Sequence, residues 1–161
     1  QLLDNLAILE AADLDHILLR SSGRTYGNKH DIHLWITPED GENASLMILL
    51  AYIIQSHPEW NDASISVFFI YQGSDDEHAT QIRDQILEGR IPIAEQNIQF
   101  IQTENESEVT KKIINKSGGA DLVILGFLDG NSVADHGSLF ERYHGLGETM
   151  FVHSNNAKII K

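Results

Sequence analysis

From residue 31 onward, short runs typical of β-strands alternate with longer runs typical of helices. The strand-like runs are rich in β-branched and aromatic residues and lie at 31–37, 65–71, 97–102, 122–125 and 150–152. Helix-like segments separate them, a spacing that favours right-handed crossovers between parallel strands. We therefore predict an α/β fold: a three-layer open sheet of about five mostly parallel strands with helices on both faces.

Local patterns refine this prediction. Two helix starts carry the pattern of a capping box, Ser74 with Glu77 and Thr103 with Glu106. The run 122–125 is apolar throughout, which is typical of a strand covered on both faces, and 157–160 is a candidate sixth strand. The residues expected in the core are Leu34, Ile36, Leu49, Ile53, Val67, Phe69, Leu122 and Ile124.

The segment 44–56 is apolar almost all round. A helix with this pattern is either buried on every face or forms an interface. Its apolar part, 46–54, is too short to cross a bilayer, which takes about twenty residues. We therefore expect no membrane insertion of this chain and treat 44–56 as a candidate interface helix.

Residues 1–30 form a separate N-terminal region whose packing the sequence leaves open, and 31–161 form a single α/β domain. Leu2, Leu3, Leu6 and Leu9 favour a helix. The stretch 16–19 either continues that helix or forms an edge strand, and 21–29 is a polar linker.

The charge of the chain excludes some functions. Its 24 acidic and 11 basic residues give a formal net charge of −13, which disfavours binding to nucleic acids. The chain has no cysteine, so it has no disulfides or thiolate metal sites. Its eight histidines show no metal-ligand pattern, and no serine occupies a nucleophile elbow. We predict no metal, no cofactor and no enzymatic activity.

The loop after 122–125 is the best candidate binding loop. It resembles the nucleotide-binding loop of universal stress proteins through Gly126, Gly130, Gly137 and Ser138, whose backbone and hydroxyl groups would contact phosphate. The spacing departs from that family, since Gly126 and Gly130 are four apart and six residues lie between Gly130 and Gly137. No Lys or Arg lies between Lys116 and Arg142, so a nucleotide phosphate would meet more negative than positive charge in this loop. Adenine-nucleotide binding is therefore kept as the alternative interpretation.

An ordered set of segments resembles the cytosolic C-terminal domain of cation–chloride cotransporters. The set comprises 32–36, Asp40-Gly41, 46–54 ending in Tyr-Ile-Ile, Trp60, 65–68, 120–125 and 146–152. It departs from the family pattern at Ile36, Glu42 and Ser66. The chain is therefore similar to a distant, prokaryotic member, and the transported ions stay open.

This resemblance implies a regulatory and dimerising domain of a secondary transporter of the amino-acid/polyamine/organocation type, without catalysis. Such a domain has a fold related to universal stress proteins and lies on the cytoplasmic side of the cell membrane. Its implied partners are a second copy of itself and the transmembrane part of the same polypeptide.

Overall fold

The computed structural model describes residues 2–73, 80, 81, 84, 93–127 and 133–155. The helices are α1 (Leu2–Ala11), α2 (Asn43–Gln55), α4 (Glu106–Ser117) and α5 (Val133–Arg142), with short 3-10 turns at η1 (Pro58–Trp60) and η2 (Glu95–Asn97). The strands are β1 (His16–Arg20), β2 (Asp31–Ile36), β3 (Ser64–Gln72), β4 (Ile98–Thr103), β5 (Leu122–Gly126) and β6 (Glu148–His153). The predicted strand 157–160, the capping box at Ser74 and the loop residue Gly130 lie outside the described residues.

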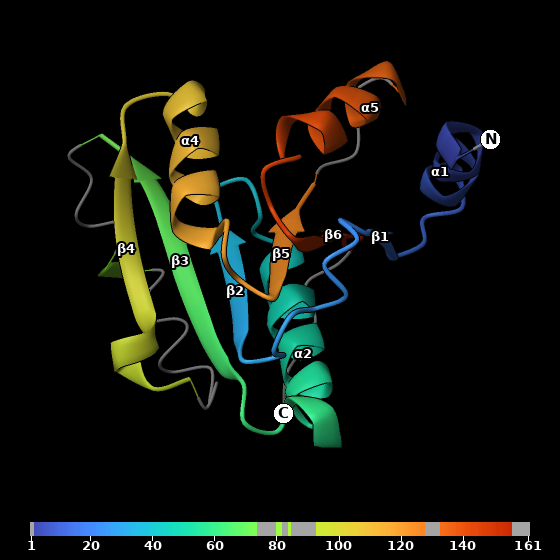
Figure 1. Cartoon of the computed structure of the whole chain (residues 1–161). Coiled ribbons are helices and arrows are strands. Elements are labelled where there is room, and N and C mark those ends of the chain that lie inside the picture. The colour runs from blue at the N-terminus through green and yellow to red at the C-terminus, as the bar shows by residue number, and fades with distance from the viewer. Residues whose placement is uncertain (1, 74–79, 82–83, 85–92, 128–132, 156–161) are drawn as a thin grey trace.

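The six strands form one sheet in the order β1-β6-β5-β2-β3-β4 (Figure 1). All neighbours are parallel except β1, which pairs antiparallel with β6. The chain runs from β2 outward through β3 to β4 and then returns to place β5 on the other side of β2. The direction of winding therefore reverses between β2 and β5, and this is the switch point of the sheet.

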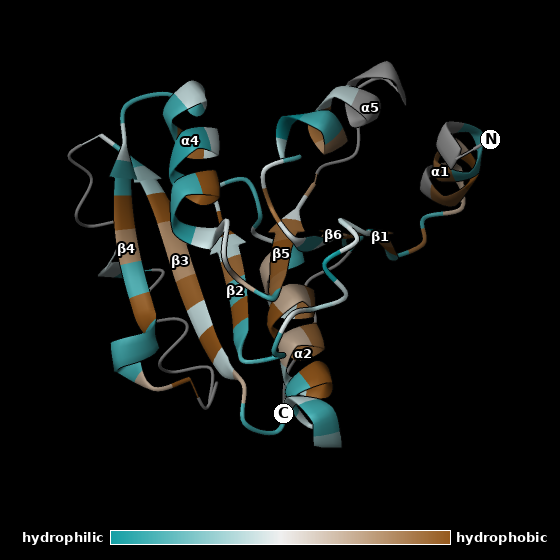
Figure 2. Ribbon diagram, in the orientation of Figure 1, coloured by the Kyte–Doolittle hydropathy of each residue, from teal (hydrophilic) through white to brown (hydrophobic). Residues whose placement is uncertain are grey.

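Each central strand contributes side chains to two cores because successive residues point to opposite faces. Leu34 packs in a cluster with Met47 and Ile48 of α2, whereas the next residue, Trp35, packs in a second cluster with Ile113 of α4. Most of α2 and of the central strands is hydrophobic, while α4 is largely hydrophilic (Figure 2). The predicted α/β sheet with helices on both faces is therefore confirmed.

The N-terminal region contributes an edge strand. Residues His16–Arg20 form β1, in which His16 lies opposite His153 and Arg20 lies opposite Thr149. The Arg20 guanidinium donates to the carbonyl oxygens of Phe140 and Leu146, both at 3.1 Å. The edge-strand alternative for 16–19 is thus confirmed, and the sheet begins before residue 31.

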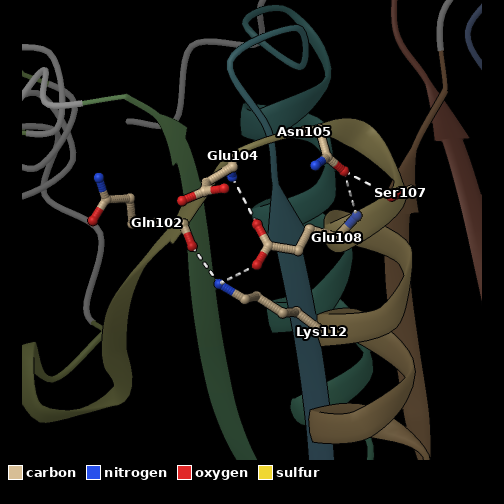
Figure 3. A network of polar contacts seen from close by, with 6 residues as sticks. All are labelled: Gln102, Glu104, Asn105, Ser107, Glu108 and Lys112. Atoms are coloured by element: carbon tan, nitrogen blue, oxygen red, sulfur yellow. Dashed lines mark hydrogen bonds and ion pairs between the residues drawn. The ribbon is translucent and has the colours of Figure 1, made fainter.

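The N-terminus of α4 is capped two residues later than the sequence predicted. Thr103 does not cap the helix, because it is the last residue of β4 and pairs with Gln72. Asn105 is the cap instead, and its Oδ1 accepts a 3.1 Å hydrogen bond from the Glu108 backbone N–H (Figure 3). The Glu108 carboxylate in turn accepts from the backbone N–H of Glu104 at 2.7 Å. Asn105 and Glu108 therefore both stabilise the start of α4, although Glu108 binds the residue before the cap and not the cap residue itself, as a capping box would.

Two of the predicted core residues lie outside the core, and both belong to α2. Leu49 is only partly buried, and Ile53 is 56% exposed. The buried face of α2 is formed instead by Asn43, Met47, Ile48 and Ala51. The helix is therefore apolar on its outer side as well as on its inner side.

Candidate functional site

A pocket of about 400 Å³ lies at the carboxyl ends of the strands around the switch point. Its wall includes Thr37–Asp40 after β2, Gly126 and Phe127 after β5, and Ile70 and Gln72 of β3. Helix α4 contributes Glu106, Val109 and Thr110, and the C-terminal half of α5 with the following residue contributes Ser138, Leu139, Arg142 and Tyr143. This is the position at which open α/β sheets hold ligands.

A buried carboxylate organises one wall of the pocket. Asp40 Oδ2 accepts hydrogen bonds from the Thr37 backbone N–H and from the Thr37 hydroxyl, both at 2.9 Å. Asp40 Oδ1 accepts from Asn43 Nδ2 at 3.1 Å. Burial raises the pKa of the Asp40 carboxyl above its ordinary value, although the hydrogen bonds from Thr37 and Asn43 oppose this shift. The three hydrogen bonds that the carboxylate accepts thus come from neighbouring residues of its own chain.

Asn43 extends this network to two further strand ends. Its amide donates to the Phe127 carbonyl oxygen at 3.1 Å, just beyond β5. Its side-chain oxygen accepts from the Ser154 backbone N–H at 2.8 Å, just beyond β6. Asp40 and Asn43 together therefore fasten the loop after β2 to the ends of β5 and β6.

Gly126 lies against the same carboxylate. A Cβ atom at this position would come within 1.8 Å of Asp40 Oδ1 and within 3.0 Å of Asn43 Nδ2. The close approach therefore requires glycine. In the sequence this glycine was a candidate phosphate-binding residue, whereas in the structure it accommodates an acidic side chain of the protein itself.

The charged side chains around the pocket are mostly acidic. Glu39, Asp40 and Glu106 contribute carboxylates, and Arg142 contributes a guanidinium. Tyr143 is buried at the base of α5, where burial raises the pKa of its phenol and a hydrogen bond with Thr110 opposes the shift. A phosphate group would meet more negative than positive charge in this lining.

The four predicted loop residues do not form one phosphate cradle in the described part of the structure. Gly126 and the exposed Ser138 both line the pocket. Gly137 belongs to helix α5, and Gly130 is not among the described residues. The sequence did not single out Glu106, Arg142 or Tyr143, because their convergence depends on how α4 and α5 pack.

One serine–histidine contact is present, and it lies away from the pocket. The Ser117 hydroxyl is 2.8 Å from His33 Nδ1 and also accepts from Trp35 Nε1 at 2.8 Å. Ser117 is fully buried, so its oxygen has no access to a substrate. Within the described ranges, no three His, Asp or Glu side chains are grouped as metal ligands are.

The order of the parallel strands and the crossovers on both faces define a doubly wound α/β domain. The chain is similar to a solved structure, the cytoplasmic domain of a prokaryotic cation chloride cotransporter. The TM-score is 0.65 at 16% identity, and the match covers 98% of this chain. The resemblance that the sequence predicted is confirmed at the level of the fold, which is what identity this low can show.

The chain spans 59% of the length of that cotransporter domain. No family model and no curated protein matches the sequence. The structural similarity therefore identifies the architecture of the domain.

Proposed function

We propose that this chain is a regulatory and dimerising domain of a secondary transporter related to cation–chloride cotransporters, and that it acts without catalysis. The observation that carries the proposal is the similarity to a cotransporter's cytoplasmic domain over 98% of the chain. In such a parent protein, the membrane spans belong to the same polypeptide and this domain lies on the cytoplasmic side. Among the described residues, no helix combines the length and apolarity needed to span a bilayer.

The composition of α2 supports a second copy as a partner. Helix α2 carries no Asp, Glu, Lys or Arg, although 22% of the whole chain is charged. Its outer side presents Ile53, which is 56% exposed, and Leu49 is only partly buried. Two copies that each carry a net charge of −13 repel one another, so contact through an uncharged helix meets the least repulsion.

Sedimentation equilibrium of the isolated chain at several concentrations tests this contact. We expect a monomer–dimer equilibrium that Ile53→Glu weakens at least about tenfold, because the introduced charge would lose water in the interface. Ile8→Glu is the matched control, since Ile8 is 66% exposed but belongs to α1. A wild-type chain that stays monomeric at millimolar concentration would remove the dimerising part of the proposal.

The assignment to a transporter makes a separate prediction about the parent gene. The reading frame upstream of residue 1 should encode a series of apolar spans of about twenty residues each. A frame without such spans would contradict the assignment and would leave the domain fold unaffected.

Adenine-nucleotide binding is the second candidate function, favoured by the place of Gly126 and Ser138 in the wall of a switch-point pocket. The excess of carboxylates in the same wall opposes it. Under this alternative, millimolar ATP or AMP with Mg²⁺ raises the melting temperature by linkage of binding to folding. An unchanged melting temperature would dismiss it.

A further inference from the structure

The C-terminal end of α4 is joined to β2 by the hydroxyl of one serine. Ser117 is the last residue of α4 and is fully buried. Its Oγ lies 2.8 Å from His33 Nδ1 and 2.8 Å from Trp35 Nε1. His33 and Trp35 are two residues apart on β2, so both side chains point to the face of the sheet that α4 covers. Ser117 is thus the common partner of two rings of β2.

The donors and acceptors of this cluster are matched when His33 is neutral. An indole N–H only donates, so Ser117 Oγ accepts from Trp35 and keeps its own hydrogen for another partner. Within the described ranges, the other hydrogen-bond partner of this hydroxyl is His33 Nδ1. Nδ1 accepts that hydrogen in the tautomer whose own hydrogen lies on Nε2. A neutral imidazole therefore completes the cluster without an unpaired buried donor.

The surroundings of the ring also oppose its protonation. His33 is only partly exposed, and its ring packs edge-on against Phe68 with the centroids 5.1 Å apart. The Lys116 ammonium lies 5.4 Å from the centroid of the same phenyl ring. Burial lowers the pKa of His33 below its ordinary value, since the charged imidazole would lose part of its water. The geometry of the cluster and the direction of this pKa shift therefore agree.

We infer that His33 and Ser117 form a proton-sensitive contact that holds the C-terminal end of α4 on the sheet. Protonation of His33 turns Nδ1 from an acceptor into a donor, so the hydroxyl hydrogen of Ser117 loses its buried acceptor. It also places a cation in a partly buried site near a phenyl ring. Once the end of α4 leaves the sheet, the ring is hydrated and takes up a proton more readily. The released state therefore binds more protons than the docked state, and acid favours release.

Three charged groups act on the ring, from the three segments around it that carry charge. Asp31 begins β2 and Asp121 directly precedes β5, and both carboxylates favour the protonated ring. Lys116 of α4 opposes it. On β3, the residue opposite His33 is the uncharged Ser66. Lys116→Gln should therefore make the contact less sensitive to acid, and Asp31→Asn should make it more sensitive.

The same helix connects this contact to the pocket at the switch point. Glu106, Val109 and Thr110 of α4 belong to the pocket wall, whereas Ser117 fastens the opposite end of the helix. Release of that end therefore loosens one wall of the pocket. The regulatory meaning of this change rests on the proposed function, because a domain on the cytoplasmic side of a membrane would respond to the pH of the cytoplasm.

Hydrogen exchange of the 161-residue chain between pH 7.5 and 5.5 tests the contact, with rates corrected for the intrinsic effect of pH. One proton taken up below about pH 6.5 changes the equilibrium for release by at most about tenfold over this range. We expect the protection of residues 113–118 to fall about three- to tenfold while that of β5 is kept. His33→Asn should remove this dependence, because its side-chain oxygen can accept from Ser117 and does not titrate. His30→Asn is the matched control, since His30 is exposed just before β2, and it should leave the dependence unchanged.

Protection of 113–118 that does not vary with pH in the wild-type chain would overturn the inference. So would a His33→Asn chain that keeps the wild-type dependence, or an equal loss of protection in β5. If the variant fails to fold, ring-carbon NMR of the wild-type chain decides, because His33 must titrate below the value of about 6.5 for an unfolded chain. Neither measurement depends on dimer formation or on the parent gene, so their failure is distinguishable from failure of the proposed function.

Discussion

The contact between Gly126 and Asp40 makes a sharp prediction about stability. In Gly126→Ala, the new Cβ would lie 1.8 Å from Asp40 Oδ1 and 2.6 Å from Asp40 Cγ. Neither partner can yield easily, because Gly126 ends a strand paired on both sides and the Asp40 carboxylate is buried and hydrogen-bonded. We therefore expect the carboxylate to be displaced from its present position.

The cost can be worked from the bonds that displacement breaks. Asp40 accepts from the Thr37 N–H, the Thr37 hydroxyl and the Asn43 amide. Hydrogen bonds to charged groups contribute about 1.5–3 kcal/mol each, so loss of two of them lowers the free energy of unfolding by about 3–6 kcal/mol. Domains of ordinary stability unfold at about 5–15 kcal/mol, so this variant should be close to unfolding.

Urea denaturation followed by the fluorescence of the buried Trp35 and Trp60 measures this change. Gly41→Ala is the matched control, since a Cβ there meets no atom within 4 Å, and it should change stability by less than about 1 kcal/mol. In an Asp40→Ala background, Gly126→Ala should cost less than about 1.5 kcal/mol, because the clashing atoms are gone. A Gly126→Ala protein as stable as wild type, or an equal loss in both backgrounds, would refute this reasoning.

Three further predictions concern buried polar groups. Ser117→Ala should lower the free energy of unfolding by about 2–4 kcal/mol, because the indole N–H of Trp35 loses its buried acceptor; a loss below about 0.5 kcal/mol in urea contradicts this. Thr103→Val should have the opposite sign, a gain of up to about 1 kcal/mol, because among the described residues the buried Thr103 hydroxyl has no partner; a clear loss in urea contradicts this. Burial raises the pKa of Asp40, so the stability it contributes is complete below about pH 3.9 and is lost as the pH rises. Asp40→Asn should therefore flatten the fall in stability as the pH rises above about 4, and an unchanged slope contradicts this.

The strands of the fold were predictable because their composition and their burial agree. The all-apolar run 122–125 became β5 (Leu122–Gly126), in which both faces are covered. The position of a helix cap was less predictable, because two overlapping patterns, Thr103 with Glu106 and Asn105 with Glu108, compete in the same segment. Pairing of Thr103 with Gln72 in the sheet decided between them, and this is a tertiary contact that no local pattern records.

The outward position of Ile53 could not be predicted from the sequence, for a different reason. A helix that is apolar on every side gives no polar face from which its orientation could be deduced. Only the packing of Met47 and Ala51 against the sheet shows which side is inward. The same property that obscured the orientation in the sequence makes the outer face of α2 a candidate interface in the structure.

The pocket was predictable in its place but not in its lining. Glycines after a buried strand indicated the loop at Gly126, and the topology put this loop at the switch point. Glu106 and Arg142 are 36 residues apart in the sequence, and they meet at the pocket only because α4 and α5 cover the same face of the sheet. Asn43 carried no sequence signal, since its role depends on three strand ends that are distant along the chain.

The Phe127 carbonyl oxygen joins the pocket wall to the edge of the sheet. It accepts from the Asn43 amide at 3.1 Å and lies 3.2 Å from Nδ1 of His153. The first bond belongs to the network of Asp40, and the second holds the ring of His153 at the end of β6. A shift of Phe127 would therefore break both bonds together, since the ends of β5 and β6 are held by the same few side chains. The His153 ring also packs against the ring of His16, the first residue of β1, with ring centroids 4.9 Å apart. The switch point of the sheet is in this way connected to its edge strand β1.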